Sequence, residues 1–217
     1  MFHIGPIEVT SVMVTMTAIT IGLTLLSYFA TRNMSERPRG LQNFMEKCVE
    51  MLDNFIADIV GKEHSRQLFP FLATLFIFIL VSNYSGLLPF AGSLPGLTAP
   101  TSVINVTAAL AVCTFCMTHY SGVRAHGVHY LAHFTKPFIF MLPLLLIDEF
   151  VRPLSLTLRL YGNIYGEETV THEIFNLVPL AVPLVMQGLS LLMGFVQAMV
   201  FVLLSSIYIS GALGEGH

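Results

Sequence analysis

The stretches of this chain that lack Asp, Glu, Lys and Arg constrain its fold more than any other feature. Three such stretches occur, at 9–30, 67–123 and 174–214. About 20 apolar residues cross the ~30 Å hydrocarbon core of a bilayer, so the middle stretch is long enough to cross twice. The composition agrees, because 54% of the residues are hydrophobic and only 11% are charged, which is too apolar for a soluble domain. We therefore expect an all-α polytopic membrane protein.

The chain is expected to form a single membrane domain over residues 1–217, with about five transmembrane helices and one amphipathic helix on the inner surface. The surface helix is indicated by apolar residues at helical spacing between 40 and 66. Two terminal segments are longer, at 1.5 Å per residue, than the bilayer core is thick, so we expect two tilted helices joined near 169–175. The expected segments are an anchor helix (9–30), the surface helix (40–66), a helical hairpin (67–123) and a tilted hairpin (137–214).

The basic residues predict the orientation in the membrane. Loops rich in Lys and Arg stay on the inner side. Two loops qualify, and their basic residues are Arg32, Arg37, Arg39, Lys47, Lys62 and Arg66 in the first and Arg124 and Lys136 in the second. We therefore expect the N-terminus outside and the C-terminus inside, in a bacterial plasma membrane or, as an alternative, an organelle inner membrane or thylakoid. The start MFHIGPIE lacks the basic residues of a signal peptide, so the first helix is expected to remain as an anchor.

Two arginines lie inside an otherwise apolar segment. A charge at mid-membrane costs at least about 2.5–3.5 kcal/mol, so such a residue usually faces a polar cavity or a partner. Arg152 follows Asp148 and Glu149 by four and three residues, and we expect a local ion pair. Arg159 has no acid within a helical turn, and a guanidinium group does not lose its charge. Its counter-charge must therefore come from another helix or another subunit.

Small and polar residues follow Arg159. Asn163 lies one helical turn further on, and Gly162 and Gly166 form a small-xxx-small pair that allows another helix to approach closely. The acid pair Glu167 and Glu168 comes next, toward the expected outer end, with Glu168 about 180° around the helix from Arg159. The last helix carries a polar stripe that is suited to line water or to hydrogen-bond to the arginine's helix: Gln187, Ser190, Gly194 and Gln197.

Three motifs of the chain match a known family. They are RPLSLTLRLYGNIYGEE at 152–168, SNYSGLLP at 82–89 and QAMVFVLLSSIYIS at 197–210. In sequence, order and spacing these motifs resemble those of subunit a of rotary ATP synthases. The resemblance covers the chain from about residue 40 onward, and the first motif is highly specific to the family.

The resemblance implies an ion-conducting stator subunit that offers two aqueous half-channels to a rotating ring of c subunits. Arg159 matches the family's essential arginine, which faces a carboxylate on the ring, drives ion release and separates the half-channels. The implied partners are the c-subunit ring, the b-subunit peripheral stalk, the multisubunit ATP synthase and the lipid bilayer, with no nucleic acid. The implied cargo is H⁺ or Na⁺. No cofactor, metal, nucleotide site or self-contained active site is implied.

By motif position, the resemblance also implies half-channel residues. Those of the outer half-channel are Asn83, Asn163, Glu168 and Gln197, and those toward the inner one are Asp148, Glu149 and Arg152. The chain departs from the family at two positions, because Ser190 replaces a His or an acid and Leu145 replaces a further acid. We therefore expect the outer relay to depend on Glu168 and water, and Asp148 to substitute on the inner side.

A row of histidines supports a competing interpretation. His119, His126, His129 and His133 recur at helical spacing, as in a membrane metalloenzyme with histidine boxes or a stand-alone cation carrier. The row has no companion cluster of acids, and THE at 171–173 lacks the second His of a zinc-protease motif. The three cysteines do not indicate a paired disulfide framework.

Overall fold

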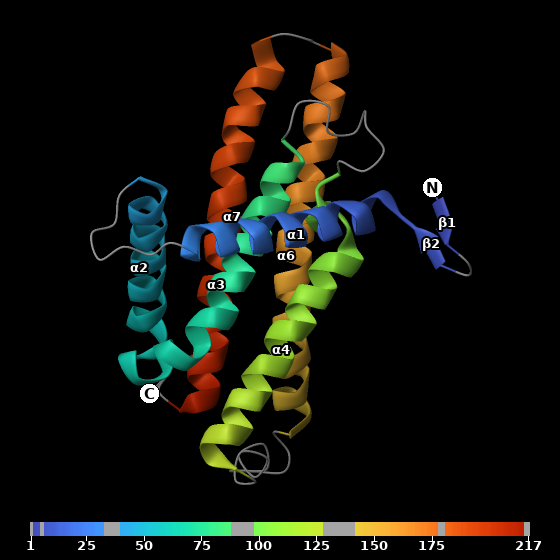
Figure 1. Cartoon of the computed structure of the whole chain (residues 1–217). Coiled ribbons are helices and arrows are strands. Elements are labelled where there is room, and N and C mark those ends of the chain that lie inside the picture. Colours follow the sequence, from blue (N-terminus) through green and yellow to red (C-terminus); the bar gives the residue numbers. More distant parts are fainter. Residues whose placement is uncertain are drawn as a thin grey trace.

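The structure is a computed structural model, and it describes residues 2–4, 7–32, 40–87, 98–127, 142–177 and 181–214. It is built almost entirely of helices, which confirms the predicted all-α membrane fold, with one short antiparallel strand pair at the N-terminus (Figure 1). The elements are β1 (Phe2–Ile4), β2 (Ile7–Val9), α1 (Ser11–Thr31), α2 (Leu41–Val60), α3 (Lys62–Ser85), the short 3₁₀ helix η1 (Pro100–Ser102), α4 (Ile104–His126), α6 (Leu142–Leu177) and α7 (Ala181–Leu213).

Four helices of the described chain are long and apolar enough to cross a membrane. They are α1, α3, α4 and, from Val185 onward, α7. Helix α6 is less apolar, because it carries seven acidic or basic residues along its length. At 1.5 Å per residue, α6 and α7 are each about 50 Å long. Both are therefore much longer than a bilayer core of ~30 Å is thick.

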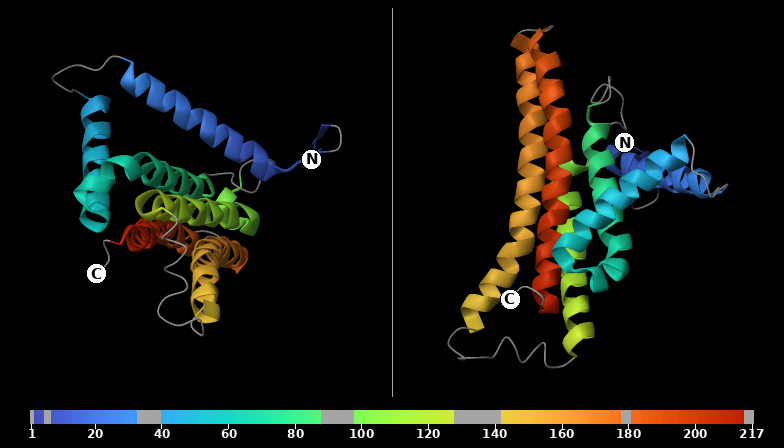
Figure 2. Two further views of the ribbon diagram at one scale, coloured as in Figure 1. Left: turned by 90° about the horizontal axis from the view of Figure 1, so that it is seen from below. Right: turned by 90° about the vertical axis from the view of Figure 1, so that its left-hand side faces the viewer.

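The helices are arranged in two directions. Helices α6 and α7 form a long antiparallel hairpin, and α3 and α4 pack along it (Figure 2). Helix α1 crosses this group steeply and makes few contacts with it (Figure 1). Only 6% of its apolar span is buried. If α1 spans the membrane, the hairpin must therefore be strongly tilted, as its length also requires.

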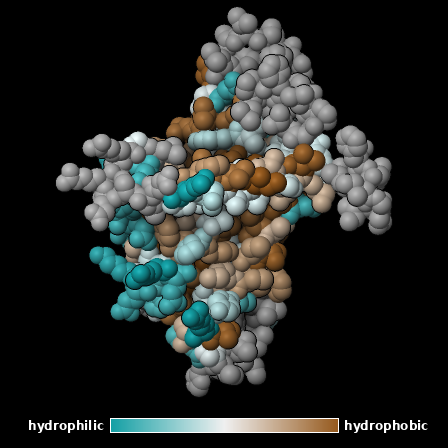
Figure 3. All heavy atoms as spheres, in the orientation of Figure 1, coloured by the Kyte–Doolittle hydropathy of each residue, from teal (hydrophilic) through white to brown (hydrophobic). Residues whose placement is uncertain are grey.

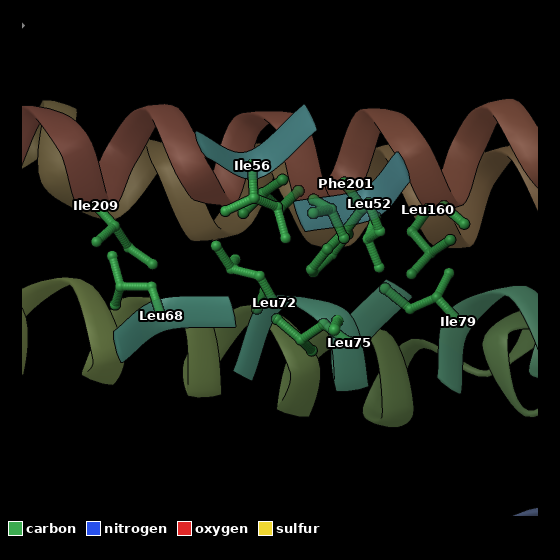
Figure 4. Packing of buried hydrophobic residues seen from close by; sticks show 14 of the residues in the cluster. Leu52, Ile56, Leu68, Leu72, Leu75, Ile79, Leu160, Phe201 and Ile209 are labelled. Carbon is green, nitrogen blue, oxygen red and sulfur yellow. The ribbon is translucent and has the colours of Figure 1, made fainter. Parts of the chain in front are cut away.

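The core lies where α2, α3, α6 and α7 meet. Leucine and isoleucine side chains from these helices point toward one another (Figure 4), and the largest fully buried ones include Ile56, Leu72, Ile79 and Leu160. Phe201 of α7 is only 1% exposed and lies in the same cluster. Burial of such a side chain stabilises a water-soluble fold by about 1.5–3 kcal/mol. Within lipid the gain comes from close packing instead.

The expected surface helix at 40–66 ends earlier in the structure. Gly61 has a φ of 82°, a conformation that glycine adopts without strain, and here α2 turns into α3. The second half of the predicted stripe, including Leu52 and Ile56, packs against α3 and α7. Phe44 and Val49, in the first half, remain exposed. Hydrophilic residues gather over α2 and the start of α3, beside a largely apolar surface (Figure 3).

The last hairpin also differs from its expected boundaries. Helix α6 continues through 169–175, where the sequence suggested a connection, and ends at Leu177. The reason is local, because residues 167–178 contain no glycine or proline and the first helix breaker is Pro179. The connection to α7 falls on 178–180, outside the described residues. Helix α6 does contain Pro153, and it bends in its first part (Figure 2), as proline in a helix interior usually causes.

Candidate functional site

Arg159 lies in the middle of α6 on an exposed face. Its only hydrogen bond among the described residues is a long one, 3.5 Å from Nη2 to Ser155 Oγ on its own helix. No carboxylate of the described chain lies within ion-pair distance of it. The sequence predicted this absence of a local partner. Inside a membrane, such a guanidinium would need a negative charge from outside the described helices.

The exposed part of α6 carries large apolar side chains. Leu154, Leu158 and Tyr165, about 100–140° around the helix from Arg159, are about half exposed, at 56%, 51% and 50%. Gly162 and Gly166 have no atom within 4 Å of the position that a Cβ would take. The predicted small-residue pair therefore faces open space. This surface can receive an apolar helix that brings one acidic group to Arg159.

A charged cluster joins α4, α6 and α7 toward the start of α6. Arg152 Nη2 lies 2.9 Å from Asp148 Oδ2, and its Nη1 lies 3.6 Å from Glu149 Oε2, so the predicted local ion pair is confirmed. Its guanidinium also lies over the ring of Tyr208 on α7, 5.5 Å from the centroid. Glu149 Oε1 is 3.7 Å from His119 Nε2 on α4. Sequence analysis missed these two contacts, since they join segments far apart in the chain.

Only part of the histidine row lies within the described residues. His126 Nε2 lies 3.0 Å from the carbonyl oxygen of Leu213, which ties the end of α4 to the end of α7. His129 and His133 lie outside the described residues. Within the described ranges, no group of three or more His, Cys, Asp and Glu residues is arranged to hold a metal ion. All three cysteines are free.

Asn83 is a buried connector between three elements. Its residue is 5% exposed, its Nδ2 donates to the carbonyl oxygen of Gly194 on α7 at 2.9 Å, and its Oδ1 accepts from Thr101 of η1 at 2.8 Å. The hydroxyl of Tyr84 donates to the carbonyl oxygen of Leu191 one turn away. Both polar ends of the Asn83 side chain are therefore occupied by the protein itself.

Glu168 points away from Arg159, to the opposite side of α6. The residue remains exposed, yet its carboxylate lies within hydrogen-bonding reach of the Ser102 side chain and the Ala99 backbone. A Cβ added at Gly86 would lie 2.9 Å from Glu168 Oε1 and 2.9 Å from the Ala99 Cβ. Glycine at position 86 is what allows the carboxylate to approach the end of α3.

Some of the remaining predicted residues are buried between helices, and others are exposed. On α7, Ser190 and Gln197 are buried at 5% and 7% exposure, whereas Gln187 is exposed. Among the described residues, the buried amide nitrogen of Asn163 has no hydrogen-bond partner. Leu145 is half-buried. The structure thus places Asn83, Glu168, Ser190 and Gln197 among the contacts of α3, α6, α7 and η1, and it sets Asp148, Glu149 and Arg152 apart at the other end of α6.

Comparison with known proteins identifies the family. A family model described as ATP synthase A chain matches residues 11–210. The chain is 45% identical to "ATP synthase subunit a" of Trichlorobacter lovleyi over 221 residues, covering all of this chain and 93% of that protein. It is 45% identical to "ATP synthase subunit a 3" of Pelobacter propionicus (90% of this chain, 84% of that one) and 43% identical to "ATP synthase subunit a" of Geobacter sulfurreducens (92% and 86%). The chain therefore belongs to the ATP synthase A chain family.

Proposed function

We propose that this chain is the ion-conducting stator of a rotary ATP synthase, with Arg159 facing the carboxylates of a rotating c-subunit ring. Its family makes it an integral membrane component of an ATP synthase. The observation that carries the finer proposal is the exposed position of Arg159 in the middle of α6, without an acidic partner in the described chain. A ring of apolar helices with one buried carboxylate each would complete that face.

The chemistry follows from the fixed charge. A nearby cation favours the ionised form of a carboxylate, so a ring site that reaches Arg159 releases its ion. The same cation prevents an ion from passing directly between the two half-channels. Ions then cross only by travelling with the ring, driven by about 2.3 kcal/mol per charge per 100 mV.

Two groups of residues are proposed to serve the half-channels. Their separation along α6 supports this division, because the Arg152 cluster precedes Arg159 and Glu168 follows it on the opposite side. The proposed inner residues are Asp148, Glu149 and Arg152, and the proposed outer residues are Asn83, Asn163, Glu168, Ser190 and Gln197. The cargo is H⁺ or Na⁺, and the further partner is the b-subunit stalk. The membrane is a bacterial plasma membrane, with the N-terminus outside and the C-terminus inside.

The deciding experiment compares Arg159→Ala with Arg124→Ala in vesicles that carry the assembled enzyme. Arg124 is an exposed arginine in the last turn of α4, so it controls for the loss of one positive charge. We expect Arg159→Ala to abolish ATP-driven ion pumping while passive ion leak is retained or increased. Arg124→Ala should pump near the wild-type rate. Normal pumping by an assembled Arg159→Ala enzyme would overturn the proposed function.

A further inference from the structure

We propose that the cavity between α1, α2 and α3 binds one phospholipid whose headgroup carries a primary amine, as that of phosphatidylethanolamine does. The cavity has a volume of about 1250 Å³, which exceeds the ~300–1,000 Å³ of a typical small-molecule pocket. Its lining comes from three helices that do not carry Arg159, so the site is independent of the ion pathway. Only its assignment to the inner leaflet rests on the orientation proposed above.

The cavity is a wedge that opens toward α2. Helix α1 contacts both α3 and η1, and the left view of Figure 2 shows α1 and α3 diverging toward α2. On α1 the lining begins at Leu23 and continues to Thr31, the last residue of the helix. The wedge is therefore open only along the second half of α1, next to the connection that leads to α2.

The depth of the wedge fits one leaflet of a bilayer. The lining from Leu23 to Thr31 covers about 12 Å of α1, and the lining from Arg66 to Ile77 covers about 16 Å of α3. Half of a ~30 Å hydrocarbon core is about 15 Å, whereas a transmembrane helix of a partner subunit needs the full thickness. The acyl chains of one leaflet therefore fit this depth better than a spanning helix does.

The deeper part of the wedge suits acyl chains. Two threonines line it, but Thr24 donates to the carbonyl oxygen of Thr20 at 2.8 Å and Thr74 to that of Pro70 at 2.6 Å. Their hydroxyl groups therefore need no hydrogen bond from a ligand. The other residues that line this part from α1 and α3 are apolar, and they include Leu23, Leu26, Phe69 and Ile77.

The wide end of the wedge can bind a phosphate group. Lys62 and Arg66 line it from the start of α3, and both are exposed. Neither of them has an ion pair with an acid of the described residues. Guanidinium and ammonium groups both bind phosphate oxygens strongly, and basic sites between membrane helices on the inner side recognise lipid headgroups in this way.

The acids at the same end select a headgroup with an amine. Three acids of α2 line the cavity with the two bases, so an anionic phospholipid would meet more negative than positive charge; they are Glu46, Glu50 and Asp53. Asp53 Oδ1 already accepts from Ser65 at 2.9 Å, which leaves its other oxygen and the exposed Glu50 as acceptors. A primary ammonium offers three N–H donors to such carboxylates, and a trimethylammonium offers none. The phosphate of phosphatidylethanolamine therefore faces α3 while its amine faces α2.

The first test photolabels the assembled enzyme. The probe is phosphatidylethanolamine with a photoreactive group in its acyl chain, present as a trace in vesicles of phosphatidylcholine. We expect cross-links at 23–31 of α1 and at 69–77 of α3. Added unlabelled phosphatidylethanolamine should remove most of them, and the same amount of phosphatidylglycerol should remove far fewer.

The exposed face of α4 around Val112 is the reference for bulk lipid, because it lies outside the cavity. Its labelling should fall equally with either added lipid. Lack of cross-links at both 23–31 and 69–77, as expected if a helix of a partner subunit fills the wedge, would overturn the proposal. Equal competition by the two lipids at the cavity would overturn the recognition of the amine.

The second test removes the charges in matched pairs. Lys62→Gln with Arg66→Gln should lower cavity labelling about tenfold or more, on the scale of two basic contacts with a lipid headgroup. The control Lys47→Gln with Arg124→Gln also removes two exposed positive charges, but outside the lining, and should label as the wild type does. Unchanged labelling of the Lys62→Gln, Arg66→Gln enzyme would overturn the phosphate contacts.

The acids are tested by Glu50→Gln with Asp53→Asn. This variant should compete equally with phosphatidylethanolamine and phosphatidylglycerol, because the carboxylates that distinguish them are gone. A preference that persists would reject the acids as the amine's partners. If a variant fails to assemble, the competition between the two lipids in the wild-type enzyme decides the proposal by itself.

The lipid site and the proposed function can fail separately. Photolabelling needs no pumping, so an assembled Arg159→Ala enzyme should label its cavity as the wild type does, whatever its pumping rate. Labelling by a probe confined to the outer leaflet would reject the proposed orientation and the assignment to the inner leaflet.

Discussion

At the residue scale, Asn83 shows how a polar residue that the family resemblance assigns to a channel can have a structural task. Its amide is satisfied by Gly194 and Thr101. We expect Asn83→Leu to destabilise the protein by about 1–3 kcal/mol, because both partners lose their hydrogen bond in a buried site. Thermal unfolding of the purified complex measures this. Thr101→Val, which removes only one of the two bonds, should cost less. A stable Asn83→Leu protein with impaired pumping would instead favour a direct role in the channel.

The acids beside Arg152 provide a second prediction at this scale. Glu149 is 15% exposed and lies near both Arg152 and His119, whereas Asp148 is 59% exposed and, within the described ranges, forms an ion pair with Arg152 only. Exposed ion pairs contribute about 0–1 kcal/mol, so Asp148→Asn should change the thermal stability little. Glu149→Gln should lower it clearly more, because it weakens the contact between α4 and α6. Equal thermal stability of Asp148→Asn and Glu149→Gln would show that the contact of Glu149 with His119 does not hold α4 and α6 together.

At the element scale, the sequence predicted the helices themselves well but some of their ends poorly. Uncharged length and apolar spacing identify α1, α3, α4 and α7, since these properties belong to each segment alone. The apolar stripe of α2 ends at Ile59, and residues 61–67 carry no apolar side chain, so the periodicity could not show at which residue the helix breaks. The partners of Asn83 and Glu149 could not be predicted, because packing between segments about 20 to 110 residues apart decides them. The lack of an acidic partner for Arg159 on its own helix could be predicted, since it depends only on that helix, whereas the sequence left a partner on another helix of the chain open.

Substitution by alanine should have opposite effects on stability at Gly194 and at Gly162. A Cβ at Gly194 would lie 3.3 Å from Asn83 Cβ and from the Tyr84 ring, whereas one at Gly162 meets nothing within 4 Å. Gly194→Ala should therefore separate α7 from α3 and cost about 1–3 kcal/mol. Gly162→Ala should leave this chain as stable or up to ~1 kcal/mol more stable, because alanine favours the helix.

If the open face of α6 receives the ring, Gly162→Ala should still impair the assembled enzyme. The added methyl group would hold the ring helix away from Arg159. Thermal stability and ATP-driven pumping, measured on the same preparation, separate the two effects. Full pumping by Gly162→Ala together with full pumping by Gly162→Leu would show that no helix packs closely against this face.

At the scale of the whole molecule, the orientation of α1 determines how the rest lies in the bilayer. Helix α1 contacts the other helices sparsely, and an open cavity of about 1250 Å³ separates it from much of α2 and α3. It crosses the α6–α7 hairpin steeply (Figure 1). These helices therefore cannot all follow the membrane normal. If α1 follows the membrane normal, the hairpin, whose helices are longer than the bilayer core is thick, must be the strongly tilted part.

This arrangement predicts the depths of labelled residues in a bilayer. Ile147 and Val170 are exposed near the two ends of α6, and 23 residues of helix separate them by about 35 Å along its axis. Nitroxide labels at these positions should differ in membrane depth by less than half of that distance. Val14 and Phe29 on α1 are also exposed and form the matched pair. Labels at these two positions should differ in membrane depth by nearly the full ~22 Å of their separation along the helix axis. A depth difference near 35 Å on α6 would mean that the hairpin stands upright, and α1 would then have to lie along the membrane surface.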